Sequence, residues 1–284
     1  PLPFELVDLE HHAVDFVGEL FSRPGQFVDE SIRVFDREVQ FYVAYLEFIS
    51  DIKHKGLAFC YPELASSPGD LFSEGGFDLA LAHNLLCKEK QVVCNDFALR
   101  GAERVIVVSG PNQGGKTTFA RSIGQMHYLA GLGCPVPGKR ARLLLCDQVL
   151  THFEKAESAA NLRGKLQDDL VRIHDMLASA TPASVLIVNE MFSSTALKDA
   201  YFLSREILMR VIGMNLPCVW VSFIDELSTL SENTVSMVGQ VDPENPAVRT
   251  FKIARMPANG LAYARSIAEK HRLTYELVKE RIRP

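Results

Sequence analysis

The hydrophobic positions in the first part of the chain follow the period of a helix. Between Phe27 and Gly56 there is no proline and no internal glycine, and the apolar residues recur in alternating steps of four and three. These residues are Val28, Ile32, Phe35, Val39, Tyr42, Leu46 and Ile49. We therefore predict one long helix that ends near Gly56. A shorter helix is predicted around Ala13–Phe21, before a Pro-Gly turn signal.

Short apolar runs replace this pattern in the rest of the chain. The segment CYPELASSPGDLFSEGGFD, residues 60–78, is rich in proline, glycine, serine and acidic residues, so we interpret it as a loop, with a domain boundary within residues 56–80. Beyond it we predict, in chain order, a strand Val105–Val108, a helix from Lys116, a strand Val185–Val188, a helix Ala200–Ile212 and a strand Cys218–Ser222. Fully apolar short strands that alternate with helices favour an α/β fold, with a mostly parallel sheet flanked by helices on both faces.

In the last part of the chain, the pattern predicts a pair of strands followed by helices. Residues 233–256 are interpreted as two strands around a turn that contains proline and asparagine. Residues 260–282 are interpreted as two short helices that divide near Leu273 and Thr274.

Composition narrows the class of protein. The chain has 284 residues, of which 47% are hydrophobic and 23% charged, the balance of a folded globular protein with one large or two modest domains. The net charge of −5 argues against a surface that binds nucleic acid broadly through phosphate neutralisation. No apolar run is long enough to span a membrane, and the residues PLPFELVDLEHH lack the charged-then-apolar order of a signal peptide, so we expect a cytoplasmic protein. The chain begins at Pro1 without methionine, so we expect it to be part of a longer protein.

The stretch SGPNQGGKTT matches the phosphate-binding P-loop pattern, and it lies where that pattern requires, between a predicted strand and a predicted helix. Glycines allow successive backbone N–H groups to turn toward a phosphate, and the start of the helix adds its positive end. Lys116 is expected to bring a mobile positive charge to the β- and γ-phosphates, and Thr117 a hydroxyl to Mg²⁺. The predicted nucleotide-binding residues are Gly110, Pro111, Asn112, Gln113, Gly114, Gly115, Lys116, Thr117 and Thr118.

The stretch VLIVNE has the form of a Walker B strand, an apolar strand that ends in polar residues beside the phosphates. In such a strand the first acidic residue usually holds the Mg²⁺ shell and the second positions the attacking water. Here Asn189 occupies the first position, and an amide brings no negative charge to the metal. Glu190 keeps the second role and is the predicted catalytic residue, so Thr117, Asn189 and Glu190 form the predicted metal site.

Three stretches together resemble the ATPase domain of the MutS family of DNA mismatch-repair proteins. They are SGPNQGGKTTF, VLIVNEMFSSTALKDA and VWVSFIDELSTL, and the resemblance covers about residues 85–284. It implies a P-loop NTPase of the ABC-like MutS type that uses ATP and Mg²⁺, forms a homodimer, and couples its nucleotide state to DNA through regions mostly outside this chain. It also implies an arrangement in which residues 1–60 are the end of the lever helices, residues 61–84 a linker, and residues 257–284 the dimerisation helices.

The resemblance assigns further contacts residue by residue. The stretch VVCNDFAL resembles the family's segment beside the adenine, which makes Val92, Asn95 and Phe97 candidate contacts of the base. The stretch ANLRGKLQDDL resembles the segment that reaches the partner's nucleotide, which makes Asn161, Arg163 and Gly164 candidate contacts in trans.

Three departures from the family pattern affect the expected activity. Asn189 replaces an aspartate, Phe223 stands where a histidine would sense the γ-phosphate, and Gly164 stands where a serine would serve the opposite subunit. The first two bear on hydrolysis, and none removes the phosphate cradle. Two hypotheses therefore stay open: a MutS-like ATPase with slow hydrolysis, and a nucleotide-gated dimerisation module that scarcely hydrolyses ATP.

Other polar residues have plainer interpretations. His152 has no second histidine at metal-ligand spacing and is interpreted as structural. Gln148 either contacts the Mg²⁺ or γ-phosphate region or is a polar strand end. The basic run Gly138–Arg142 is interpreted as a solvated loop rather than a nucleic-acid contact.

Overall fold

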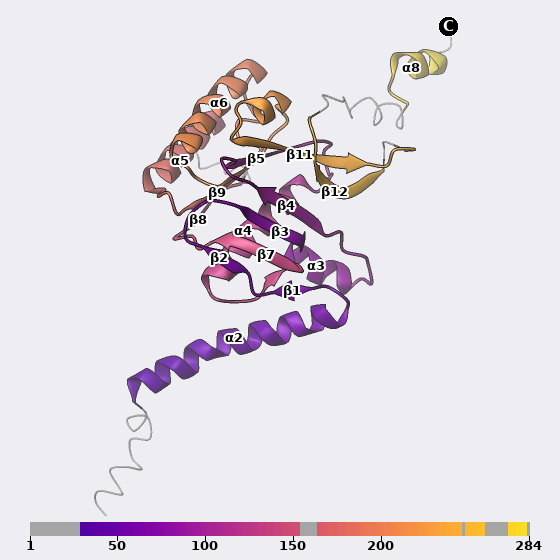
Figure 1. Ribbon diagram of the computed structural model, residues 1–284. Helices are drawn as coiled ribbons and strands as arrows, with labels where there is room; N and C mark the ends of the chain where they lie inside the picture. Colours follow the sequence, from indigo (N-terminus) through magenta and orange to yellow (C-terminus); the bar gives the residue numbers. More distant parts are fainter. Residues whose placement is uncertain (1–28, 154–163, 246–247, 259–271, 283–284) are drawn as a thin grey trace, which may run out of the picture. The chain divides into compact units, whose positions relative to one another are not determined.

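The structure, a computed structural model, describes residues 29–153, 164–245, 248–258 and 272–282 (Figure 1). The chain divides into two compact units, residues 1–51 and 52–284. The long helix predicted over residues 27–56 is present as α2, Glu30–His54. The shorter helix predicted around Ala13–Phe21 lies outside the described residues.

A six-stranded sheet forms the centre of the second unit. Its strand order is β12-β11-β5-β10-β9-β8, and every neighbouring pair is parallel except β11 with β12. The strands are β5 (Val105–Ser109), β8 (Val149–His152), β9 (Val185–Asn189), β10 (Cys218–Val221), β11 (Thr234–Val241) and β12 (Arg249–Arg255). The mostly parallel sheet and the final pair of strands are therefore confirmed as predicted.

Helices cover both faces of this sheet, which explains why its central strands are fully apolar. Along β5, Val105 and Val107 belong to the hydrophobic cluster that α5 (Lys165–Ser179) and α6 (Leu197–Gly213) form with the sheet. The other face is covered by α4 (Lys116–Gly131), where Gly124 lies so close to Ile187 of β9 that an added Cβ would meet the isoleucine at 3.4 Å. Figure 1 shows α5 and α6 side by side. The predicted α/β fold is confirmed.

A second sheet occupies the region that the sequence predicted as a loop. Four strands pair in the order β2-β7-β3-β4, and β1 pairs separately with β6. These strands are β1 (Phe59–Cys60), β2 (Glu63–Ala65), β3 (Leu71–Gly76), β4 (Asn95–Leu99), β6 (Val136–Pro137) and β7 (Arg140–Leu144), and α3 (Leu79–Leu86) follows β3. The loop prediction was wrong for β3 because small buried residues fit there: an added Cβ at Gly76 would lie 3.1 Å from Met126 of α4, and the hydroxyl of the buried Ser73 donates to the sulfur of Met126 at 3.4 Å.

The two C-terminal helices predicted by the sequence are described in part. A short 3₁₀ helix, η2 (Asp225–Thr229), follows β10, and α8 (Tyr275–Arg281) begins where the second C-terminal helix was predicted. The first of the two predicted helices falls on residues 259–271, outside the described part of the chain.

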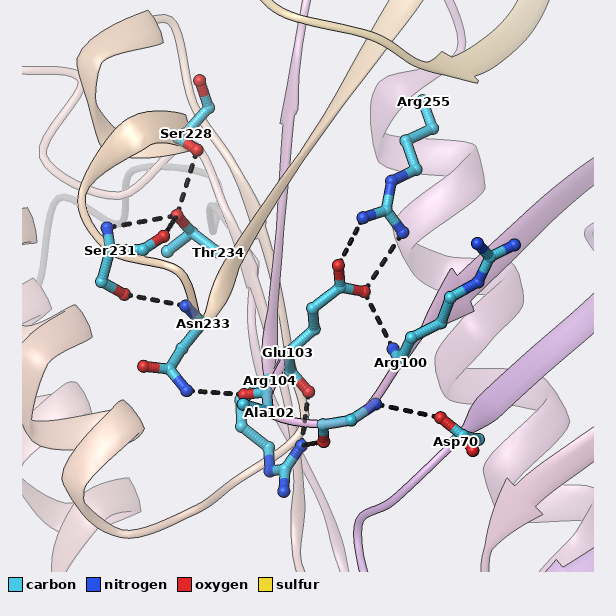
Figure 2. Close-up of polar contacts among 11 residues, drawn as sticks. Asp70, Arg100, Ala102, Glu103, Arg104, Ser228, Ser231, Asn233, Thr234 and Arg255 are labelled. Carbon is cyan, nitrogen blue, oxygen red and sulfur yellow. Dashed lines mark hydrogen bonds and ion pairs between the residues drawn. The ribbon is translucent and has the colours of Figure 1, made fainter.

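A polar network fixes the start of β5 to its neighbours (Figure 2). Glu103 accepts hydrogen bonds from the guanidinium of Arg255 on β12. Asn233, just before β11, accepts from the backbone nitrogens of Arg104 and Val105 and donates from its amide to the carbonyl of Ala102 at 2.6 Å. These bonds hold β5, β11 and β12 together at the edge of the sheet where the parallel strands begin.

Candidate functional site

The glycine-rich loop, residues 110–115, joins β5 to α4 at the carboxyl edge of the sheet. Gly110 has φ 117°, and a Cβ there would lie 2.9 Å from the backbone nitrogen of Gly239, so glycine is required at this position. Gly115 has φ 91° and is the N-cap of α4, which no side chain caps. The first N–H groups of α4 therefore have no intrahelical acceptor, and with the positive end of the helix they are suited to contact an anion.

Lys116 is held inside this loop. The residue is only 4% exposed, and its Nζ donates to the carbonyl oxygens of Gly110 and Pro111, at 3.0 and 3.1 Å, and to Oδ1 of Asn112 at 3.4 Å. Burial lowers the pKa of Lys116, and although Glu190 opposes this shift, the net pKa is below the usual lysine value. A buried ammonium whose hydrogen bonds go to neutral oxygens is suited to exchange them for an anion.

A cavity of about 590 Å³ opens beside the loop, a size that falls within the range of small-molecule sites. Its phosphate-loop side is lined by Gln113, Gly114, Gly115, Lys116, Thr117 and Thr118, and Glu190 closes that end. Its other wall is apolar and comes mainly from α3 and the segment that follows, with Leu81, Leu85, Val92 and Val93. The cavity thus joins a positively charged, N–H-rich end to an apolar end, as a ligand with a phosphate chain and a flat ring requires.

The apolar wall is fixed by a buried carboxylate. Asp78 is the N-cap of α3 and accepts from the backbone nitrogen of Leu81 at 2.7 Å. Its second oxygen accepts from Arg121 and Gln125 of α4, at 2.5 and 3.0 Å. Asp78 therefore ties α3 to the same helix that carries Lys116.

The end of β9 supplies the acidic side of the site. Asn189 is 7% exposed, and its Oδ1 has no hydrogen-bond partner within the described part of the chain. Glu190 follows with φ 51°, and the buried Phe192 with φ 62°. Left-handed conformations at non-glycine residues are strained and occur often at functional sites. The turn after β9 thus holds Glu190 at the cavity, whereas Asn189, whose amide oxygen has no partner in the described ranges, is not among the residues that line it.

Phe223, just after β10, contributes a ring rather than a hydrogen-bonding group. Its ring centroid lies 4.9 Å from Nζ of Lys116, which is within the range of a cation–π contact. A phenyl ring cannot donate a hydrogen bond to an oxygen anion. The ring of Phe223 therefore stabilises the positive charge of Lys116 and can donate no hydrogen bond to a phosphate.

The structure places only part of the candidate adenine contacts at the cavity. Val92 and Asn95 line the cavity, although the side-chain amide of Asn95 is bonded to β12 through the carbonyl of Phe251 and the nitrogen of Ile253. Phe97 is buried in β4, outside the cavity lining.

The candidate contacts in trans are described in part. Asn161 and Arg163 lie outside the described residues. Gly164 is exposed and is the N-cap of α5.

Two polar residues, one just before β8 and one in it, are structural, and neither is among the residues that line the cavity. Gln148 precedes β8, and its amide donates to the carbonyl of Ser179 at 2.7 Å, at the edge where the parallel strands begin. The strand-end interpretation of Gln148 is therefore the one that the structure supports. His152 is buried with its Nε2 3.0 Å from Asp169 Oδ1, as a structural histidine would be.

Sequence reasoning missed two residues of β12 that contact the glycine-rich loop. Phe251 lines the cavity with φ 59°, and its ring lies against Gly115. Arg249 donates from Nε to the backbone oxygen of Asn112 at 3.2 Å. Neither belongs to a local motif. The sequence could have indicated the α3 wall, because Asp78 followed by an apolar helical run is an N-cap signal.

Comparison with known proteins decides the family. Residues 106–270, more than half of the chain, match the model of MutS domain V. The chain belongs to the MutS family. The matched range begins within β5 and includes the glycine-rich loop, both residues at the end of β9, and Phe223.

Curated relatives agree at low identity. The DNA mismatch repair protein MSH3 of Kluyveromyces lactis is 26% identical over 129 residues, 45% of this chain and 12% of that protein. The DNA mismatch repair protein MutS of Brevibacillus brevis is 27% identical over 182 residues, 63% and 21% of the two chains. MutS of Clostridium botulinum (strain 657 / Type Ba4) is 21% identical over 261 residues, 88% and 28%. The chain spans about a tenth to a quarter of the length of these relatives.

Three further observations concern metal-binding clusters, membrane-spanning helices and cysteines. No cluster of three or more histidine, cysteine, aspartate or glutamate residues suited to a metal ion occurs in the described ranges. The described helices include none that is long and apolar enough to cross a membrane. All six cysteines are free thiols.

Proposed function

We propose that the chain binds ATP in the cavity beside the glycine-rich loop. The observation that carries this proposal is the buried Lys116 at an uncapped helix N-terminus, facing a cavity whose far wall is apolar. The N–H groups of residues 114–118 and Lys116 would hold the phosphates. The apolar wall, with Leu81, Leu85 and Val92, would hold the adenine ring.

Mg²⁺ fits the residues at the end of β9. The Oδ1 of Asn189 is a buried oxygen acceptor without a partner in the described ranges, and oxygen ligands are those that Mg²⁺ prefers. Thr117 would supply a hydroxyl and Asn189 an oxygen for a water of the metal shell. The ion would neutralise charge on the phosphates. Because Asn189 is uncharged, we expect the metal to be bound less tightly than by a carboxylate.

Hydrolysis is proposed to be slow and to depend on Glu190. This carboxylate lines the cavity and would orient the water whose oxygen bonds to the terminal phosphorus as the bond to ADP breaks. Two features weaken the step: Asn189 adds no charge at the metal, and Phe223 adds no hydrogen bond to the departing phosphate. Family membership supports a role in which the nucleotide state controls dimerisation and DNA binding or repair.

The test is steady-state phosphate release by the chain, with ATP binding measured on the same sample. We expect slow turnover that falls about a hundredfold in Glu190→Gln while ATP affinity stays within about twofold, because the amide keeps the volume and loses the base. Glu206→Gln, an exposed glutamate on α6, is the matched control and should leave both values unchanged. Turnover that is insensitive to Glu190→Gln would contradict the assignment of Glu190.

A second function is favoured by the ring of Phe223 over Lys116. In that case the chain is a nucleotide-gated dimerisation module that binds ATP and scarcely hydrolyses it. Saturable ATP binding, together with a phosphate-release rate equal in wild type and Glu190→Gln, is the result that this alternative predicts. ATP-dependent dimerisation measured by light scattering should then persist in both chains.

A further inference from the structure

The tip of the glycine-rich loop contains a strained residue that the loop itself does not hold. Gln113 has φ 58°, a left-handed conformation that residues other than glycine adopt only when their surroundings fix it. Within the loop, the nitrogen of Gly114 donates to the carbonyl of Pro111 at 3.2 Å, and the added Cβ of Gly114 would collide with that carbonyl at 2.9 Å. These contacts set the turn, but they do not anchor the exposed tip to the body of the protein.

The β11–β12 hairpin supplies anchors from behind the loop. The backbone of Gly239 lies against Gly110 at the start of the loop, and the ring of Phe251 lies against Gly115 at its end. Arg249 contacts the tip between them, where its Nε donates to the backbone oxygen of Asn112 at 3.2 Å. Of these three contacts, the one from Arg249 is next to the strained Gln113.

Asn112 connects Arg249 to Lys116. Its backbone oxygen accepts from Arg249, and its Oδ1 accepts from Nζ of Lys116 at 3.4 Å. Arg249 also acts on Lys116 through space. Burial is the larger cause of the lowered pKa of Lys116, and the positive charge of Arg249 lowers this pKa further. The position of Asn112, and through it the hydrogen bond to Nζ of Lys116, therefore depends on Arg249.

We propose that Arg249 is a positioning residue that fixes Asn112 and Lys116 for the terminal phosphate of a nucleoside triphosphate. This inference rests on the proposed function, since it assumes that the cavity takes a nucleotide. Asn112, which Arg249 contacts, lies at the loop tip before the first turn of α4, and that first turn would hold the inner phosphates. Arg249 thus sets how strongly the site prefers a triphosphate to a diphosphate.

The test compares the dissociation constants of ATP and ADP, each measured by calorimetric titration with Mg²⁺ present. In Arg249→Gln we expect ATP binding to weaken about tenfold and ADP binding by less than about twofold, because one charge-assisted hydrogen bond at the tip is lost. Arg249→Lys keeps the charge but loses the planar Nε–H. It should lower the ATP preference about threefold.

Arg255→Gln is the matched control. Arg255 lies on the same strand but bonds to Glu103 at the opposite edge of the sheet, as Figure 2 shows, so the ratio of the two constants should not change. Equal weakening of ATP and ADP in Arg249→Gln, or no weakening of either, would overturn the inference while leaving the proposed function intact. If Arg249→Gln does not fold, an unchanged ratio of the ATP and ADP dissociation constants in Arg249→Lys overturns the inference. A wild-type chain that binds neither nucleotide refutes the proposed function itself.

Discussion

The two sides of the candidate site are built in different ways. The glycine-rich loop relies on backbone geometry: Gly110 and Gly115 have positive φ, and the helix that begins at Lys116 has no side-chain cap. The ends of β9 and β10 rely on side-chain identity, and there the chain has Asn189 and Phe223. Because the loop is shaped by its backbone, it keeps its conformation when side chains at the ends of β9 and β10 change. From this difference we expect that the proposed nucleotide binding and the proposed hydrolysis can be lost separately.

The electrostatics of the two sides support this separation. Lys116 and Arg249 bring positive charge to the loop, whereas Glu190 is the one carboxylate among the residues that line the phosphate end of the cavity. A site with this balance attracts polyphosphate. It has less negative charge to hold a divalent ion than a site with two carboxylates. Affinity for the nucleotide is therefore expected to exceed the capacity to cleave it.

The largest expected effect comes from the loop side. Lys116→Met removes the ammonium that would meet the phosphates, so ATP binding should weaken about a hundredfold or more. The fold should not lose stability, because burial already disfavours this charge. Titration calorimetry gives the affinity and thermal unfolding gives the midpoint.

The control for that variant is Lys198→Met, which removes an exposed lysine of α6 outside the cavity. It should leave ATP affinity unchanged. Equal ATP affinity in Lys116→Met and wild type would mean that Lys116 does not contact the phosphates of ATP. It would also contradict the view that the glycine-rich loop is the side of the site that binds the nucleotide.

The same contrast explains what could be predicted from the sequence. The glycine-rich loop and the strand before Asn189 form local patterns, so their place at the carboxyl edge of a parallel sheet followed from the sequence alone. The strand β3 did not, because Ser73 and Gly76 are stable in a strand only through partners on β4, β7 and α4. Such partners are tens of residues away and leave no period in the sequence.

The contacts of β12 with the loop were equally hidden. Phe251 has a left-handed conformation inside a strand, and nothing in its neighbours along the chain indicates this. Arg249 reaches a residue that precedes it by 137 positions. Both contacts depend on the register of the β11–β12 pair, which shifts between Gly239 and Val241. Tertiary register, rather than local sequence, decides which side chains meet the loop.

The second prediction tests whether the backbone of the loop is as fixed as the contrast requires. Gly110→Ala forces a left-handed residue at φ 117° and brings its Cβ to 2.9 Å from Gly239. We expect a loss of about 2 kcal/mol in unfolding free energy, or a fall in Tm of roughly 4–8 °C. ATP affinity should fall as well.

Gly101→Ala is the matched control, because Gly101 also has positive φ, 54°, but has open space around its Cβ position. It should cost about 1 kcal/mol and leave ATP affinity unchanged. Equal losses of Tm in the two variants would mean that the contact with Gly239 contributes nothing to the loop.

The measurement that tests the central claim most directly is phosphate release at saturating ATP and Mg²⁺ by Asn189→Asp, with ATP affinity measured in parallel. A carboxylate at this position adds negative charge to the proposed metal site, where Asn189 supplies none. Turnover should therefore rise about tenfold, while the dissociation constant of ATP changes by less than about threefold. The buried Oδ1 of Asn189 already lies without a protein partner in the described ranges, so an oxygen there has no other bond to lose. An unchanged turnover with unchanged affinity would contradict the claim that the end of β9 limits hydrolysis.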